Sequence, residues 1–173
     1  MRLTNKLLPG GRGLAPALIR RARYLELGWD VRQKSRFDAV DSTGRPLGVV
    51  LPRGSVLRGG DLLVDEEGSF VVVRAALQPV MRVTVCSAHG TPLDLLRAAY
   101  HLGNRHVALE LRPDHLKLEP DHVLAAMLRR MHLIVAEVLD AFEPEAGAYG
   151  HHGDHPAPPA HAHEHAHAHE HAS

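Results

Sequence analysis

Residues 91–111 read TPLDLLRAAYHLGNRHVALEL, a helix signal followed directly by a strand signal. Thr91 is a good N-cap residue, Pro92 suits the first helical position and Gly103 suits a helix end. Apolar residues recur between them at helical spacing: Leu95, Leu96, Ala99 and Leu102. Polar and apolar residues then alternate over His106–Leu111, which predicts a strand.

The residues on either side of this stretch extend the pattern. Val80–Cys86 alternates as a strand before it, and Leu116–Leu118 marks a returning strand after it. Asp121 can cap a second helix, and Leu133–Leu139 has the composition of a last strand. The order β-α-β-β-α-β predicts a ferredoxin-like domain over residues 79–149, with both helices on one face of an antiparallel sheet.

The first half of the chain reads as short strands separated by the turn clusters Asp41–Gly44 and Asp65–Gly68. The strand-like segments are Arg36–Val40, Leu47–Leu51, Asp61–Val64 and Phe70–Arg74. We therefore predict a small β-rich domain over residues 1–78, and an α+β chain overall. Residues 1–20 match no pattern that we can interpret.

The chain ends in a histidine-rich tail, predicted over residues 150–173. Nine of the fifteen histidines lie there: His151, His152, His155, His161, His163, His165, His167, His169 and His171. Neutral imidazole is a common ligand for nickel, copper and zinc. A segment without large apolar side chains cannot offset its ordering entropy. We therefore expect a disordered tail that collects metal ions.

Two other interpretations of the tail carry less weight. A purification tag is usually a contiguous histidine run, whereas here histidine alternates with alanine or glutamate. His163–His167 fits the zinc-protease pattern H-E-x-x-H, but that chemistry needs a buried helix. Nothing in the tail would anchor such a helix.

Composition narrows the class of protein. A length of 173 residues suits one or two small domains, and no apolar run reaches the roughly 18 residues of a membrane helix. The single cysteine, Cys86, lies in an alternating apolar run, which indicates a packed thiol in a reducing compartment, so we expect a cytoplasmic protein. We find neither a nucleophile–base pair nor a glycine-rich phosphate loop, and predict no enzyme.

The charge is unevenly spread although its sum is zero. Residues 1–36 hold nine lysines and arginines against two acidic residues, a net +7. The aromatic residues are too few to interleave with these charges as nucleic-acid stacking requires. The basic segment therefore indicates a solvated strand edge or a surface for an acidic protein partner.

Six histidines precede the tail, and three of them are candidate ligands. His101 and His106 bracket the end of the predicted helix, while His122 opens the second helix, where the helix dipole keeps imidazole neutral. Asp121 can cap that helix, accept a hydrogen bond from an imidazole, or coordinate metal. The predicted sheet leaves His106 and Glu110 on its open face, free for a ligand or partner. The other histidines fall in a turn, on the polar side of a strand or at a helix end: His89, His115 and His132.

Several separate motifs follow one another along the chain: Arg32–Arg36, Asp41–Gly44, Gly48–Gly54, Gly60–Asp61, Tyr100–Glu110 and Phe142–Tyr149. The last of them leads directly into the histidine tail. Together they resemble the UreE family, the urease accessory nickel metallochaperones. The likeness extends from about residue 20 onward and does not depend on the tail alone.

The resemblance implies a β-rich N-terminal domain that engages protein partners and a ferredoxin-like domain that dimerises. It implies that His106 binds nickel at the dimer interface, where both copies converge on one ion. His101 and His122 match positions that carry additional metal-binding histidines in some members. Some relatives have a further histidine where this chain has Pro120, so the peripheral metal pair of those relatives cannot form here in the same way.

We therefore expect a homodimeric nickel metallochaperone that delivers Ni²⁺ for assembly of the urease active site. Its expected partners are the urease accessory GTPase and the urease apoprotein complex, with no nucleic acid and no membrane. Zn²⁺ and Cu²⁺ can also bind, because imidazole affinity alone does not favour nickel. The alternative is a histidine-rich protein that stores or buffers nickel or zinc without delivering it.

Overall fold

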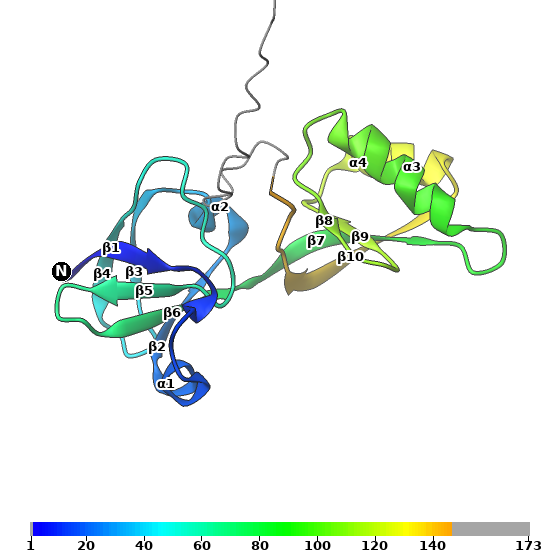
Figure 1. Ribbon diagram of the computed structural model, residues 1–173. Helices are drawn as coiled ribbons and strands as arrows, with labels where there is room; N and C mark the ends of the chain where they lie inside the picture. The colour runs from blue at the N-terminus through cyan, green and yellow to red at the C-terminus, as the bar shows by residue number, and fades with distance from the viewer. Residues whose placement is uncertain (1, 147–173) are drawn as a thin grey trace, which may run out of the picture.

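The computed structural model describes residues 2–146, which form two β-sheets with helices beside them (Figure 1). The α+β class predicted from the sequence is confirmed. The predicted tail and its nine histidines lie outside the described residues. Within residues 2–146, every helix is too short or too polar to cross a membrane.

The first sheet has six strands in the order β2-β6-β5-β1-β4-β3. These strands are β1 (Arg2–Leu8), β2 (Arg23–Leu27), β3 (Arg36–Val40), β4 (Pro46–Val50), β5 (Leu62–Asp65) and β6 (Phe70–Ala75). The short helices beside them are η1 (Pro9–Gly11), α1 (Pro16–Arg21) and α2 (Trp29–Arg32). Strands β3 to β6 each fall within one residue of a segment predicted from alternation and turn signals.

The start of the chain, in which the sequence showed no interpretable pattern, forms strand β1. It lies inside the sheet, parallel to β4 and antiparallel to β5. Its buried side chain near the start is the polar Thr4, whereas Leu3 is exposed. The pairing also shifts register between Thr4 and Lys6. An irregularity of this kind breaks the period-two pattern by which a strand is recognised.

Arg23 of β2 ties together the two predicted turns of this sheet. Its guanidinium lies 2.6 Å from the carboxylate of Asp41 and 2.7 Å from that of Asp65. Both aspartate side chains are fully buried, and the second oxygen of each accepts backbone N–H groups of its own turn. The turn clusters are therefore fixed by buried, charge-assisted hydrogen bonds.

These contacts make the stability of the first sheet depend on pH. Burial alone would raise the pKa of Asp41, but hydrogen bonds from Thr43, Arg45 and Arg23 outweigh it and lower the pKa to about 2. A carboxyl whose pKa is lower in the folded state stabilises the fold above its unfolded pKa of about 3.9 and loses this effect as the pH falls. We expect Asp41→Asn to lower the free energy of unfolding by about 2 kcal/mol at neutral pH. Urea titrations should show the difference shrinking from about pH 4 to about pH 2; a difference independent of pH would contradict the assignment.

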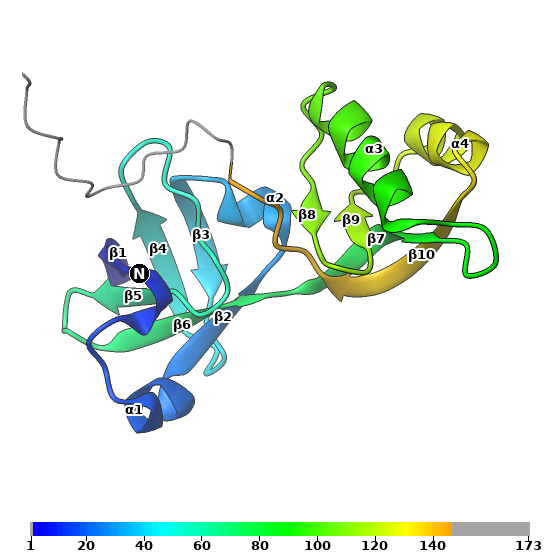
Figure 2. The ribbon, with the colours of Figure 1, turned by 45° about the vertical axis from the view of Figure 1, so that its right-hand side comes forward.

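The second sheet has four antiparallel strands in the order β10-β7-β9-β8. Its elements are β7 (Leu77–Val85), α3 (Pro92–Gly103), β8 (Glu110–Leu111), β9 (Leu116–Leu118), α4 (His122–Arg130) and β10 (Leu133–Ala141). Along the chain this is the β-α-β-β-α-β order. Figures 1 and 2 show α3 and α4 on the same face of the sheet, and both helices bury side chains in one core cluster with it.

Both helices begin at the capping residues that the sequence suggested. The carboxylate of Asp94 accepts hydrogen bonds from the N–H and the hydroxyl of Thr91, at 2.8 and 2.9 Å. Asp121 accepts from two N–H groups of the first turn of α4. The buried residues of α3 are Leu95, Ala98 and Leu102. Leu96, which the spacing placed on the apolar face, is instead 66 % exposed.

The two sheets meet at Ala76, between β6 and β7. Trp29 from α2, Val80 from β7 and Phe142, which follows β10, form a separate buried cluster there. The rings of Trp29 and Phe142 meet edge to face, with centroids 6.1 Å apart. The segment that begins at Phe142 is therefore anchored at the junction of the two sheets.

Candidate metal centre

His106 lies in the turn that follows α3 and not on a strand. Its φ of +56° is in the left-handed region, and its N–H donates to the carbonyl of Gly103 at 2.9 Å. The strand predicted over His106–Leu111 is therefore wrong for its first four residues, since β8 comprises only Glu110–Leu111. Histidine is one of the few residues other than glycine enriched in this conformation, and unusual backbone conformations cluster at functional sites.

The side chain of His106 is exposed and lines a cavity of about 470 Å³. The wall of this cavity includes Gly103 from the end of α3, and Glu145 and Ala146 from the segment after β10. The backbone N–H of Glu145 donates to the carbonyl of Leu109 at 2.8 Å. The last described residues before the tail are thus tied to the chain just beyond His106.

The other two candidate histidines are also exposed. His101 lies on α3, with its ring edge-on to Tyr100 at a centroid distance of 5.4 Å. His122 is the first residue of α4, and its neighbour Asp121 takes the capping role among the three roles considered for it. Within residues 2–146, no three histidine, cysteine, aspartate or glutamate side chains are grouped so that they could hold an ion. A single chain therefore presents isolated imidazoles and no assembled site within residues 2–146.

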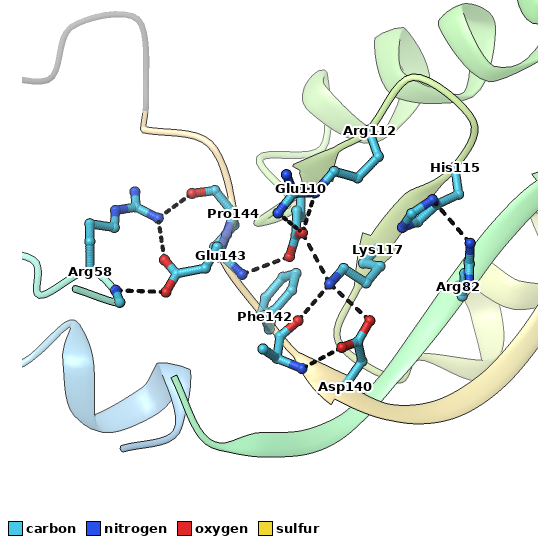
Figure 3. A network of polar contacts seen from close by, with 12 residues as sticks. Arg58, Arg82, Glu110, Arg112, His115, Lys117, Asp140, Phe142, Glu143 and Pro144 are labelled. Atoms are coloured by element: carbon cyan, nitrogen blue, oxygen red, sulfur yellow. Dashed lines mark hydrogen bonds and ion pairs between the residues drawn. The ribbon is translucent and has the colours of Figure 1, made fainter. Parts of the chain in front are cut away.

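Glu110 lies in a buried network of polar contacts (Figure 3). One carboxylate oxygen lies 3.0 Å from Nζ of Lys117 and accepts from Arg112 at 2.7 Å, while the other accepts from the N–H of Glu143 at 2.7 Å. Burial alone would raise the pKa of Glu110, but these hydrogen bonds outweigh it and lower the pKa. The expectation that Glu110 is free for a ligand is therefore wrong.

The network continues across the junction through Glu143. Its carboxylate accepts hydrogen bonds from Arg32 at 2.9 Å and from the N–H of Gly59 at 2.8 Å. Arg32 is fully buried and also donates to the carbonyl of Phe142. Arg58 contacts the same carboxylate and the carbonyl of Pro144 (Figure 3). Arg32 of α2, Arg58 of the loop between β4 and β5, and Glu110 of β8 thus hold the segment that leads into the tail.

Sequence reasoning did not find this network. Arg32 and Glu143 both lie in motifs singled out above, but they are 111 residues apart and nothing in a single sequence pairs them. One local signal was present: Lys117 stands between two leucines of a strand, and Glu110 is its partner on the neighbouring strand. A buried lysine needs a carboxylate partner, so this cross-strand pair could have been proposed.

The described chain thus presents an exposed turn histidine beside Glu145 and Ala146, its last described residues. Residues 5–76 match the N-terminal domain of the UreE urease accessory protein, and residues 78–171 match its C-terminal domain. The urease accessory protein UreE of Albidiferax ferrireducens is 67 % identical over 160 residues, which cover 91 % of this chain and 92 % of the relative. The protein of the same name from Verminephrobacter eiseniae is 59 % identical over 160 residues, covering 90 % and 95 %.

The chain belongs to the UreE family of urease accessory proteins. The resemblance inferred from its motifs is confirmed, and with it a role in urease maturation. This is a family of accessory proteins and not of enzymes, as the sequence predicted.

Proposed function

We propose that the chain is a homodimeric, cytoplasmic metallochaperone that binds Ni²⁺ and delivers it for assembly of the urease active site. Two His106 imidazoles, one from each protomer, form the shared site, with His101 and His122 as further ligands. The tail histidines collect metal. The observation that carries the proposal is the exposure of His106 beside Glu145 and Ala146, the last described residues before the tail.

A shared site follows from the ligand chemistry of one protomer. A transition-metal ion needs several ligands, and residues 2–146 of a single chain group no three candidate side chains around His106. A second imidazole from a two-fold partner supplies another ligand, and water or tail histidines complete the shell. Such an open site exchanges ligands one at a time, so a receiving protein can take the ion directly. A closed four-cysteine cage would instead favour permanent zinc binding.

The surface near His106 supports a second copy as the partner. Leu96 and Tyr100, four residues apart on α3, are 66 % and 67 % exposed. Leu111 is also exposed and lines the same cavity as His106. Leu96 and Tyr100 lie on the helix that ends beside this cavity. Exposed apolar side chains are typical of an interface. A two-fold dimer places the same residue of both copies at its axis, as a shared His106 site requires.

The tail contributes capacity through its position. The hydrogen bond between Glu145 and Leu109 holds the last described residues close to His106. The first tail histidine, His151, follows six residues after Glu145, so we expect the tail histidines to act at a high effective concentration there. Imidazole ligands bind copper more tightly than nickel, so the choice of nickel must come from metal availability and from partners. We assign partner binding to the six-stranded domain, and propose the urease accessory GTPase and the urease apoprotein complex as partners.

Delivery and storage predict different results in one reconstitution. The nickel-loaded chain is mixed with urease apoprotein and accessory GTPase, with a chelator in excess over the metal. A delivery protein should be retained by immobilised GTPase and should restore urease activity despite the chelator. A storage protein should fail to bind the GTPase and lose its nickel to the chelator. Activity that appears only without chelator would mean that the ion is released and not handed over, against the proposal.

A further inference from the structure

A second group of potential metal ligands lies at the opposite end of α3 from His106. Cys86, His89 and His132 line a cavity of about 650 Å³ beside the first turn of that helix. His106 follows the other end of the helix, and twelve residues of α3 separate the two places by about 18 Å. The sequence offered no reason to connect these three residues.

The pairing of β7 with β10 brings Cys86 and His132 together. The last pair of this antiparallel ladder is Val85 with Leu133. Cys86 directly follows that pair on one side, and His132 directly precedes it on the other. His132 has a left-handed φ of +62°, and its N–H donates to the carbonyl of Arg129 at 3.0 Å. The two strand ends therefore present a thiol and an imidazole to one cavity.

The spacing of Cys86 and His89 suits a single ion. The sulfur lies 4.0 Å from Nδ1 of His89, on the loop that joins β7 to α3. Zinc–sulfur and zinc–nitrogen bonds are about 2.3 and about 2.0 Å long, so an ion between the two atoms can bind both without moving them apart.

The nearby carboxylate of Asp94 is already engaged. It accepts two hydrogen bonds from Thr91 as part of the helix cap. The Asp94 carboxylate therefore serves as part of the α3 cap. His132 remains as the third potential metal ligand on the cavity wall.

We infer that Cys86, His89 and His132 form a second metal site, separate from His106, for a borderline-soft divalent cation of the zinc type. One sulfur and two nitrogen ligands match the preferences of that ion. Cys86 and His89 hold it first, and binding draws in the imidazole of His132, because the three side chains are not preassembled within residues 2–146. Water occupies the fourth position, which leaves the site open to exchange.

The single cysteine of the chain makes this site testable in the full-length protein. Co²⁺ can stand in for zinc, and a sulfur-to-cobalt charge-transfer absorption can arise only from Cys86. We expect a saturable band that Cys86→Ser abolishes. His132→Ala should weaken the binding that produces the band by at least about tenfold, as the loss of a ligand should cost no less than the loss of an outer partner. His106→Ala and His115→Ala should leave the band unchanged.

Three outcomes would overturn the proposal. No charge-transfer band at saturating Co²⁺ would show that the thiol is not a ligand. A band that survives both His89→Ala and His132→Ala unchanged would assign the ion to Cys86 with other partners. A band lost in His106→Ala would mean that the cysteine belongs to the dimer site. Alkylation of Cys86 gives an independent measurement: Zn²⁺ should slow it at least about tenfold in the unsubstituted protein and much less in His132→Ala.

Discussion

Replacing His106 with alanine should abolish the tightest phase of nickel binding in a calorimetric titration and leave most of the remaining binding. The proposed shared site loses one imidazole from each protomer, and residues 2–146 group no three candidate side chains around His106 that could replace them. Removing an outer partner of a metal ligand typically costs about 10–100-fold in affinity, so the loss of two direct ligands should exceed that. Binding to the tail histidines should persist.

Two matched variants give this result its meaning. His115→Ala removes another histidine of the same domain, and this variant should leave the tightest phase intact. In the folded chain, Nδ1 of His115 contacts the carboxylate of Asp114 at 2.8 Å. A chain that ends at Gly150 should show the reverse of His106→Ala: the number of ions per dimer falls steeply while the tightest phase persists. An unchanged tight phase in His106→Ala would refute the assignment of the shared site.

The sequence wrongly predicts a strand at His106, because alternating polarity does not determine the backbone conformation at the end of a helix. The alternation from His106 to Leu111 predicts a strand, and no other local signal in this stretch opposes it. The backbone there is decided by the end of α3, where the N–H of His106 bonds Gly103 and that of Val107 bonds Leu102. The helix caps at Thr91 and Asp121 were predicted correctly because their cause is local. A turn that closes a helix depends on hydrogen bonds that polarity does not encode.

Contacts between distant segments account for the rest of what the sequence did not show. His101, His106 and His122 were named from spacing and from the family resemblance, but nothing along the chain indicated the hydrogen bond that ties Glu145 to Leu109. The sequence alone indicates a packed thiol at Cys86 and a helix-end residue at His132, because their proximity depends on the register of β7 against β10. Register is set by the folded sheet as a whole, so a single strand does not reveal its neighbours.

Arg32→Ala should lower the free energy of unfolding by about 3–5 kcal/mol, because it removes one partner of a buried charge pair. Arg32 is fully buried, and it donates to the carboxylate of Glu143 and to the carbonyls of Leu27 and Phe142. Its guanidinium also lies 5.3 Å from the ring centre of Trp29. The matched control is Arg36→Ala, an exposed arginine four residues further on, which should change stability by no more than about 0.5 kcal/mol. Urea unfolding at neutral pH measures both variants, and equal losses would contradict the role given to Arg32.

The same substitution should loosen the base of the tail before the whole protein unfolds. Arg32 holds Phe142 and Glu143, and two residues later the N–H of Glu145 bonds Leu109 beside the His106 cavity. Hydrogen exchange at the Glu145 amide should therefore accelerate more in Arg32→Ala than exchange in the β7–β10 ladder, which contains none of these contacts. In Arg32→Lys, the exchange rate of the Glu145 amide should lie between that of the unsubstituted protein and that of Arg32→Ala. Lysine keeps the charge but lacks the planar guanidinium that donates to several acceptors. Uniform acceleration at every amide would instead indicate global destabilisation. It would contradict the prediction that Arg32 specifically holds the segment around Glu145 in place.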